Sequence, residues 1–223
     1  MAKVYASKIR LQKSSEEISS MMEKVPEWRR QFARRFRMTE DTVRCLAAYL
    51  LAARVIADSF GCLSGDVKMT HSEFGKPEIL FPEGCHFNIS HSGEWVVCAV
   101  DSSPVGIDVE SIKPMDIELA RRFFTSREYR YILDQPPENR LSTFLETWSF
   151  KECYLKAQGT GLHRSLNSFC VLRSGGEVTV EDTQAAVLNL KLRSFFIDEG
   201  YVMAVAAANI SDTAEILPEE YFC

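Results

Sequence analysis

Two carboxylates stand in an otherwise apolar stretch of the chain, "GIDVES" at residues 106–111. Asp108 and Glu110 alternate there with isoleucine and valine, which have high strand propensity. Because alternate side chains of a strand point to the same face, both carboxylates project together, about 7 Å apart at their Cα atoms. Two interpretations are open: an edge strand with its acidic face in water, or a divalent cation held by both carboxylates.

A third carboxylate and a lysine follow in "WSFKECYLKAQGTGL", residues 148–162. On a helix, Trp148, Glu152 and Lys156 lie four residues apart along one side. Alone, Glu152 and Lys156 are typical of a surface ion pair. Beside the two strand carboxylates, Glu152 would complete an oxygen-rich site of the kind that Mg²⁺ prefers, with Lys156 near the phosphates of a substrate.

The segment "FNISHSG", residues 87–93, places an imidazole and two hydroxyls next to a turn glycine. Ser90 and His91 belong to a set of groups that suits a phosphate, although a structural histidine is the alternative. A Ser–His hydrolase is not favoured, because the sequence has no G-x-S-x-G elbow. Lys76 in "FGKP" is either an anion contact or an exposed turn lysine.

The composition excludes several other classes of protein. The chain has 223 residues and a net charge of −5, which argues against a general nucleic-acid binder. Neither a P-loop motif nor a G-x-G-x-x-G motif occurs. The basic stretch "WRRQFARRFR" at residues 28–37 carries five arginines, either as a solvated helix face or as a site for an anion.

The cysteines and the apolar segments predict where the protein resides. Seven cysteines are odd in number, scattered and without a C-x-x-C pair, so we expect reduced thiols rather than disulfides or a zinc site. The start of the chain lacks the apolar core of a signal peptide, and the longest apolar run, residues 46–57, is too short to span a bilayer. The expectation is a cytoplasmic protein that does not bind membranes.

The order of the expected elements predicts an α+β fold in two similar halves. The first half has a strand near residues 4–9, helices at 15–37 and 40–60, and a hairpin at 85–101. A short polar link with a proline, residues 101–106, is the best boundary, and it gives halves of 1–103 and 104–223. The second half has the strand at 106–110, an interrupted helix at 116–133, a helix at 140–158 and four later strands.

The ordered set "FGKP", "FNISHSG", "VGIDVE" and "WSFKECYLKAQGTGL" resembles the motif series of the Sfp-type 4′-phosphopantetheinyl transferases. The similarity runs over nearly all of the chain. It implies a monomeric pseudo-dimer of two similar α+β halves with the active site between them. The half 1–103 would contact the nucleotide of coenzyme A, and the half 104–223 would hold the metal-binding and catalytic residues. The implied reaction moves the 4′-phosphopantetheine arm of coenzyme A to a serine of an apo acyl or peptidyl carrier protein.

The resemblance also assigns roles to single residues. Asp108, Glu110 and Glu152 match the three acids that bind Mg²⁺. Glu152 and Lys156 would act in catalysis, Glu152 as the base and Lys156 beside the phosphates as 3′,5′-ADP leaves. Glu128 is the second choice for the base. The implied contacts to coenzyme A are Lys76, Ser90, His91, Lys151 and Lys156.

The early helix departs from the family pattern. Family members often carry lysines in a "P-E-K" helix near the 3′-phosphate, whereas this chain has Trp28 followed by arginines. An arginine fork binds phosphate well, but the sequence does not identify which arginine would do so. Two other functions stay open: a Mg²⁺-dependent coenzyme A or nucleotide pyrophosphatase, and a catalytically inactive carrier-binding module.

Residues 111–133 follow the strand that carries Asp108 and Glu110, and they are more apolar than a segment beside an active site needs to be. Met115, Ile117, Phe123 and Phe124 are either core residues or, as the resemblance suggests, part of the surface that docks the carrier. Helix spacing makes Phe123 the expected core member, and Phe124 is then expected to contact the carrier.

Overall fold

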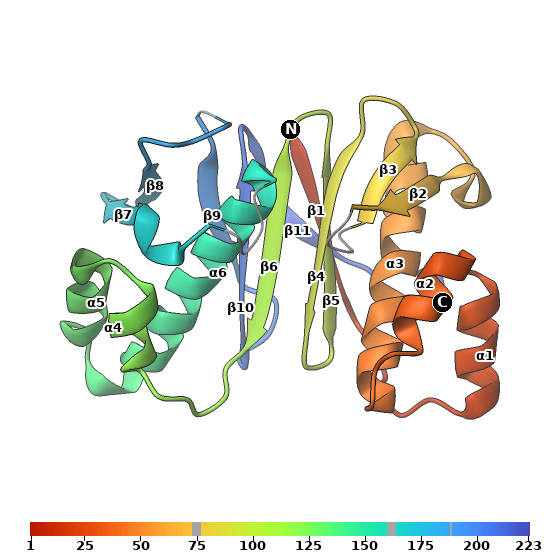
Figure 1. The fold of residues 1–223 in the computed structure, drawn as a ribbon, viewed down its shortest axis with the longest axis horizontal. Helices are drawn as coiled ribbons and strands as arrows, with labels where there is room; N and C mark the ends of the chain where they lie inside the picture. The colour runs from red at the N-terminus through yellow and green to blue at the C-terminus, as the bar shows by residue number, and fades with distance from the viewer. Residues whose placement is uncertain (73–76, 160–163, 188) are drawn as a thin grey trace.

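The computed structural model describes residues 1–72, 77–159, 164–187 and 189–223, with the longest strands in the middle and the helices towards the two sides (Figure 1). Six α-helices are described within these residues: α1 (Ser15–Glu23), α2 (Glu27–Ala33), α3 (Thr39–Phe60), α4 (Leu119–Phe123), α5 (Ser126–Leu133) and α6 (Arg140–Gln158). The strands of the first half are β1 (Ala2–Lys8), β2 (Lys68–His71), β3 (Pro77–Phe81), β4 (His86–Ser92) and β5 (Trp95–Asp101). The later strands are β6 (Val105–Ser111), β7 (Cys170–Ser174), β8 (Glu177–Glu181), β9 (Lys191–Phe195), β10 (Tyr201–Ala207) and β11 (Ile210–Ile216).

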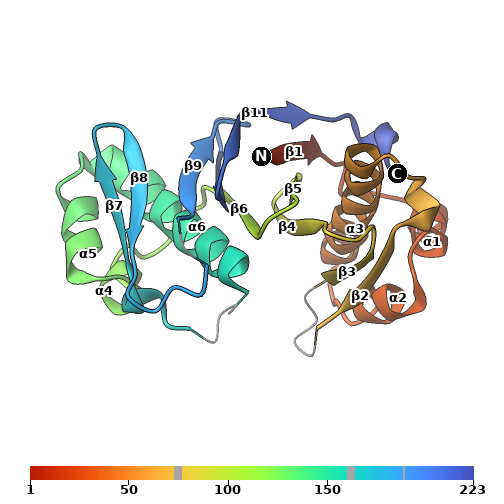
Figure 2. The same cartoon turned by 90° about the horizontal axis from the view of Figure 1, so that it is seen from above.

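The strands form two main sheets. The first has the order β11-β1-β5-β4 and the second the order β6-β10-β9-β8-β7, while β2 and β3 form a separate pair. The long helix α3 packs on β4 and β5, and α6 packs on β6 and β10. Each half is therefore a sheet with one long helix on its outer side, and the predicted α+β fold is confirmed (Figure 2).

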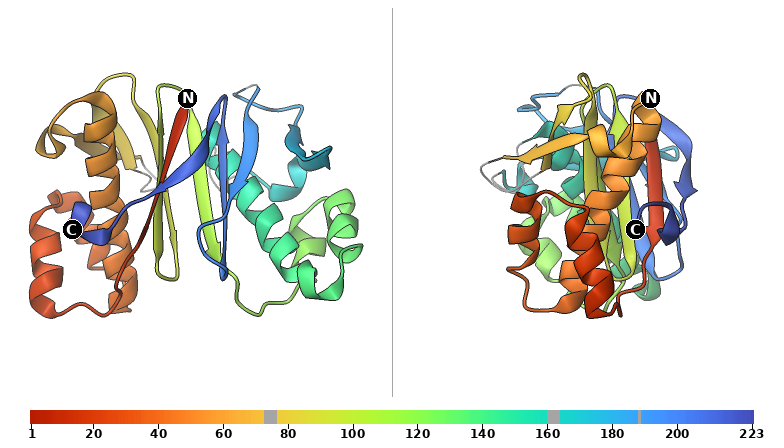
Figure 3. Two further views of the ribbon diagram at one scale, coloured as in Figure 1. Left: turned by 180° about the vertical axis from the view of Figure 1, so that it is seen from behind. Right: turned by 90° about the vertical axis from the view of Figure 1, so that its right-hand side faces the viewer.

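The last strand crosses from one half to the other, which the sequence analysis did not predict. β11 pairs with β1 in parallel, with Val4 opposite Ala214, and the chain then ends among the helices of the first half (Figure 3). Leu217 and Phe222 are buried in the core of that half. The predicted second half, 104–223, is therefore not one unit in space, because the residues from 210 onward complete the first sheet.

Local sequence explains where the helices begin and end. Ser14 and Glu17 form a capping box at the start of α1, and Pro26 separates α1 from α2 within the single helix expected at 15–37. Thr125 and Glu128 form a second capping box, which starts α5 and produces the expected interruption after α4. The helix α6 has the predicted bounds, 140–158.

The two halves share an apolar core between their sheets. Val97 of β5, Ile107 and Val109 of β6, and Val205 of β10 are buried in it. Since side chains alternate along a strand, burying Ile107 and Val109 on this face turns the carboxylates of β6 to the opposite face. None of the helices within the described ranges has the length and apolar character that crossing a bilayer requires.

Candidate active site

The candidate site lies where β4 of the first sheet and β6 of the second run beside each other. These two edge strands are joined through side chains rather than through a backbone ladder. The amide of Ile107 donates to Asn88 Oδ1 at 2.9 Å, and Ser90 Oγ donates to Asp108 Oδ1 at 3.0 Å. We call this contact the β4–β6 seam, made by Asn88, Ser90 and Ser92 of β4 with residues 107–111 of β6.

A close contact between α6 and β6 completes the site. A Cβ built on Gly106 would lie 1.9 Å from the carbonyl oxygen of Cys153 and 2.7 Å from the amide nitrogen of Ala157. Only glycine permits this approach, since any side chain would push the helix away. The contact brings the turns of α6 that carry Glu152 and Lys156 over the strand that carries the two acids.

Lys156 is the link between the three elements. Its Nζ donates to Asp108 Oδ1 at 2.7 Å, to the carbonyl oxygen of Ile107 at 3.1 Å and to Ser90 Oγ at 3.3 Å. Burial lowers the pKa of Lys156, but the Asp108 carboxylate outweighs burial and the net pKa is raised. The ammonium is therefore held in its charged form at the seam.

The carboxylates of the site are crowded and partly desolvated. Burial, followed by the charge of Asp108, raises the pKa of Glu110 to about 7, and burial raises the pKa of Glu152 as well. Asp108 is only 4% exposed, and its Oδ2 is buried without a hydrogen-bond partner among the described residues. An unpartnered carboxylate oxygen beside two further acids is an arrangement that a hard divalent cation would stabilise.

The acids do not form a finished metal site as they stand. Within the described ranges, no group of three or more His, Cys, Asp or Glu side chains has the arrangement needed to hold a metal ion. The residue types and the unpartnered oxygen fit a cation, whereas the assignment of Asp108, Glu110 and Glu152 as its ligands remains a prediction.

His91 lies on the opposite face of β4 from Ser90, as strand alternation requires. Burial, followed by the nearby charges of Arg29, Lys156 and Arg44 in that order, lowers the pKa of His91 to about 4. The imidazole is therefore neutral at pH 7 in the free protein. A surplus of positive charge around a neutral histidine suits an anionic ligand.

The early arginines have separate environments. Arg29 is buried; its Nη2 donates to the carbonyl oxygen of Cys45 at 2.8 Å, and the centroids of three aromatic rings lie 5.6–5.9 Å from its guanidinium carbon. Arg30 and Arg34 both pair with Glu27. The basic stretch is thus partly core and partly surface. Arg29 is the arginine of this stretch whose charge lowers the pKa of His91.

Two residues with a predicted role in the site are buried in the core of the second half. Lys151 was expected to contact coenzyme A, but its side chain is fully buried and its Nζ lies 2.8 Å from Glu128 Oε1. The same ammonium donates to the carbonyl oxygens of Leu166 and Phe169 at 2.8 and 2.7 Å. Glu128, the second choice for the base, is 2% exposed and accepts hydrogen bonds from the amides of Thr125 and Val171. Both residues serve the core of the second half.

Lys76, the remaining predicted contact, lies outside the described residues. Two further hydroxyls line the site, Ser92 and Ser111. Ser92 was expected only as one of the hydroxyls of a phosphate-binding turn, and Ser111 was not predicted. The period-two spacing of Asn88, Ser90 and Ser92, opposite a strand that also carries polar groups, is the signal that would have identified the seam.

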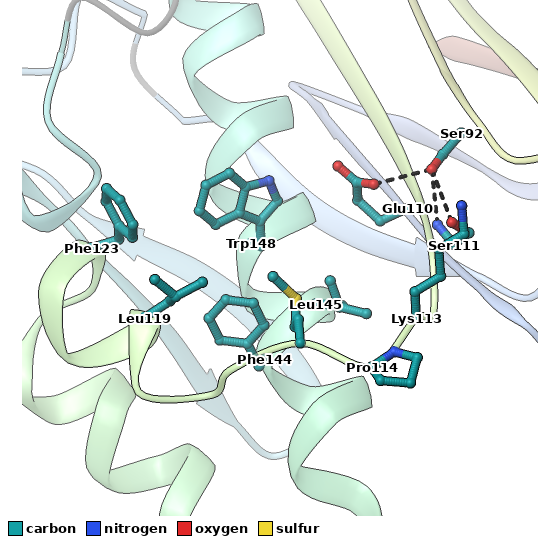
Figure 4. A pocket seen from close by; sticks show the side chains of 11 residues that line it. Ser92, Glu110, Ser111, Lys113, Pro114, Leu119, Phe123, Phe144, Leu145 and Trp148 are labelled. Atoms are coloured by element: carbon teal, nitrogen blue, oxygen red, sulfur yellow. Dashed lines mark hydrogen bonds between the residues drawn. The ribbon is translucent and has the colours of Figure 1, made fainter.

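A pocket of about 380 Å³ opens beside Glu110 (Figure 4). Ser92, Glu110 and Ser111 make its polar end, and Leu119, Phe123 and Trp148 belong to its apolar walls. The other lining residues are Lys113, Pro114, Met115, Phe144 and Leu145.

The aromatic residues of this region occupy positions that the sequence analysis had reversed. Phe123 lines the pocket, whereas Phe124 is 4% exposed and packs against Phe144 and Trp148 with ring centroids 5.2 and 6.2 Å apart. The expectation that Phe124 contacts a carrier protein is therefore wrong, because the side chain is a core residue.

Two family models match adjoining parts of the chain. A family model described as the 4′-phosphopantetheinyl transferase superfamily matches residues 104–206, and one described as 4′-phosphopantetheinyl transferase, N-terminal, matches residues 11–103. The chain is similar to 4′-phosphopantetheinyl transferase Sfp of Bacillus subtilis strain 168, with 38% identity over 199 residues and 88% of each chain covered. It is 37% identical over 180 residues to 4′-phosphopantetheinyl transferase psf-1 of Bacillus pumilus, covering 79% of this chain and 76% of that one.

A solved structure also matches part of the chain. Holo-[acyl-carrier-protein] synthase of Helicobacter pylori, in complex with coenzyme A, matches with a TM-score of 0.38 and 20% identity. The match covers 46% of this chain and 96% of that one.

Proposed function

Because the chain belongs to the 4′-phosphopantetheinyl transferase superfamily, we propose that it transfers the 4′-phosphopantetheine arm of coenzyme A to a serine of an apo acyl or peptidyl carrier protein. The observation that carries this proposal is the meeting of Lys156 from α6, Asp108 from β6 and Ser90 from β4 at one point between the halves. The Lys156 ammonium and the Ser90 hydroxyl can donate to the oxygens of a diphosphate. The unpartnered Asp108 Oδ2 can bind the cation that accompanies the diphosphate.

The reaction joins the serine oxygen to the β-phosphorus of coenzyme A and breaks the bond from that phosphorus to the bridging oxygen. 3′,5′-ADP leaves, and the serine proton passes to a carboxylate. Glu152 is proposed to accept this proton, because its raised pKa makes it a stronger base near neutral pH than an ordinary glutamate. Lys156 is positioned to offset the charge that develops on the leaving phosphate.

The nucleotide end of coenzyme A would meet the cationic side of β4. His91, with Arg29 and Arg44 near it, is proposed to face the 3′-phosphate, and Ser90 the phosphates at the seam. Lys76 is proposed as a further phosphate contact on the resemblance of its motif. Arg29 then supplies the charge that lysines of the early helix supply in other family members.

Asp108, Glu110 and Glu152 are proposed to hold Mg²⁺. The ion would neutralise the diphosphate of coenzyme A. Supporting observations are the unpartnered Asp108 Oδ2 and the raised pKa values of Glu110 and Glu152, since crowded acids gain most from a cation. Titration with Mn²⁺ in a calorimeter tests the assignment: Asp108→Asn should abolish binding while the protein stays folded.

The pocket beside Glu110 suits the pantetheine arm, which is uncharged and alternates short carbon segments with a hydroxyl and two amides. Its walls carry Leu119, Phe123 and Trp148, and its polar end is the carboxylate assigned to the metal. An arm that starts at a phosphate beside Glu110 would thus run into an apolar pocket, where burial of its carbon segments favours binding.

The two halves supply both sides of the site from one chain, so we propose that the protein acts as a monomer. A cytoplasmic location is proposed as well, since all seven cysteines are free. The deciding experiment mixes the protein with coenzyme A, Mg²⁺ and apo carriers of several classes, and weighs the intact carriers. A carrier heavier by one phosphopantetheine supports the proposal, whereas cleavage of coenzyme A without any carrier would identify a pyrophosphatase instead.

A further inference from the structure

The turn between β4 and β5 is held by a tyrosine of the other half. The amide of Glu94 donates to the Tyr201 hydroxyl oxygen at 3.0 Å. A Cβ on Gly93 would lie 2.1 Å from that same oxygen, and Gly93 has a φ of +55°. Both the backbone conformation and the space therefore require glycine, and the turn fits tightly against Tyr201.

The first half holds the same turn from its other side. Arg44 of α3 donates through Nε to the carbonyl oxygen of Gly93 at 2.7 Å. The Tyr201 ring also packs against Trp95, which begins β5, with ring centroids 6.4 Å apart. The turn is thus held between α3 and β10, directly after the last residue of β4, Ser92.

The hydroxyl of Ser92 has a defined direction. The amide of Ser111 donates to Ser92 Oγ at 3.0 Å, and Ser92 Oγ lies 3.1 Å from Glu110 Oε2. A serine hydroxyl has one proton to donate, and the ionised carboxylate is an acceptor only. With the Ser111 amide occupying one lone pair, the proton has two acceptors within reach, Glu110 Oε2 at 3.1 Å and Ser111 Oγ at 3.4 Å, both marked in Figure 4. The shorter distance and the charge of the carboxylate favour Glu110.

We propose that Ser92 is a positioning residue for Glu110, and that Tyr201 acts through Ser92 by holding the turn that presents it. The inference rests on the proposed function, in which Glu110 is a metal ligand. Ser92 fixes one carboxylate oxygen of Glu110 at the polar end of the pocket and leaves the other for the ion. Partners that orient a ligand in this way commonly change metal affinity or activity by about tenfold or more when removed.

The test compares four single variants and one double variant with the wild-type chain. Ser92→Ala removes the hydrogen bond, Ser92→Thr keeps the hydroxyl, and Tyr201→Phe removes only the hydroxyl that accepts from Glu94. Ser7→Ala is the matched control, because Ser7 is a fully buried serine of β1 whose hydroxyl has no hydrogen-bond partner in the described part of the chain. Each variant is assayed for kcat and KM of transfer, for Mn²⁺ affinity without substrate, and for its melting temperature.

We expect Ser92→Ala to lower kcat by about tenfold and to weaken Mn²⁺ binding by a similar factor, with the KM for coenzyme A changed much less. Ser92→Thr should keep most of both quantities, and Ser7→Ala should match the wild type. Tyr201→Phe should show a smaller loss, and Ser92→Ala combined with Tyr201→Phe should be no worse than Ser92→Ala alone, because the two residues act through one hydrogen bond.

Wild-type kcat and Mn²⁺ affinity in Ser92→Ala would overturn the role of Ser92. If the double variant loses kcat or Mn²⁺ affinity by the product of the two single-variant factors, the part assigned to Tyr201 is overturned. Transfer by the wild-type protein tests the proposed function separately: an inactive wild type defeats that function, whereas an active wild type with an equally active Ser92→Ala defeats only this inference.

Discussion

Gly106 and Cys153 set the distance between the strand and the helix that carry the acids of the site. A Cβ on Gly106 would lie 1.9 Å from the Cys153 carbonyl oxygen, so α6 rests on the bare backbone of β6. The atom in the way belongs to a helix backbone and cannot rotate aside. The relative position of Asp108 and Lys156 therefore depends on a residue that has no side chain.

Gly106→Ala is expected to destabilise the protein by at least about 2 kcal/mol, since overpacking against the backbone must move α6. The transfer rate should fall further than the loss of folded protein explains, because Lys156 and Glu152 move with the helix. Urea unfolding and kcat/KM measure the two effects. Gly65→Ala is the control, since nothing lies within 4 Å of its Cβ position. Equal behaviour of the two variants would contradict the close-contact explanation.

Lys151→Met tests whether the buried Lys151–Glu128 pair is structural. Removing one partner leaves an uncompensated buried charge, which typically costs about 3–5 kcal/mol. Adding Glu128→Gln should recover part of the stability, because glutamine has no charge and its single carbonyl oxygen can still accept from the amide of either Thr125 or Val171. Chemical denaturation measures both variants.

The same variants separate this role from a contact to coenzyme A. In the folded double variant, the Kd for coenzyme A should match that of the wild type. A large rise in that Kd, with stability unchanged in Lys151→Met, would return Lys151 to the ligand site.

Glu110 should make the stability of the metal-free protein depend on pH. Burial, followed by the charge of Asp108, raises its pKa from the ordinary 4.5 to about 7, so the folded state favours the protonated carboxyl. The resulting stability is fully present below pH 4.5 and is lost as the pH rises through about 7. In EDTA, the free energy of unfolding should fall by on the order of 1–2 kcal/mol more in the wild type than in Glu110→Gln between pH 5 and 8. Parallel pH profiles for the two proteins would show that Glu110 is not perturbed.

His91→Gln should reduce the preference for coenzyme A over dephospho-coenzyme A. If the imidazole meets the 3′-phosphate as proposed, the lost charge-assisted contact is worth about 1.5–3 kcal/mol, which corresponds to tenfold or more in relative affinity. Competition binding with the two ligands measures the ratio. A ratio that stays at the wild-type value would place His91 away from that phosphate.

The pKa of His91 adds a second readout of the same contact. The pKa is about 4 in the free protein, so the imidazole is neutral at pH 7.5, and a bound phosphate would raise that pKa. Binding of coenzyme A near pH 5 should then take up protons, which calorimetry in buffers of different ionisation enthalpy detects. His91→Gln should show less proton uptake than the wild type.

Much of the fold and of the site could be predicted because the signals are local. The bounds of α6 follow from its sequence, and the alternation in "GIDVE" placed Asp108 and Glu110 on one face of a strand. The ordered motifs indicated the family before any geometry was known, because residue types at fixed spacing reflect a shared chemistry.

The environments of individual residues could not be predicted in this way. Lys151 and Lys156 stand five positions apart on the same helix. Lys151 is buried in the core with Glu128, whereas Lys156 pairs with Asp108 of β6. Phe123 and Phe124 are neighbours in the chain, and only the packing of α4 against α6 decides which of them is buried. Successive side chains of a helix point about 100° apart, so neighbouring residues meet different partners. The sequence alone does not say which elements surround the helix.

By itself, the sequence determined the elements, the chemistry of the acids and the family. Only the tertiary structure decided that β11 returns to the first sheet, that Tyr201 holds the β4–β5 turn, and that Ser92 meets Glu110. These contacts join residues 18 to more than 200 positions apart. They arise from how two sheets pack around a shared apolar core, and such packing is set by the whole chain rather than by any local stretch of it.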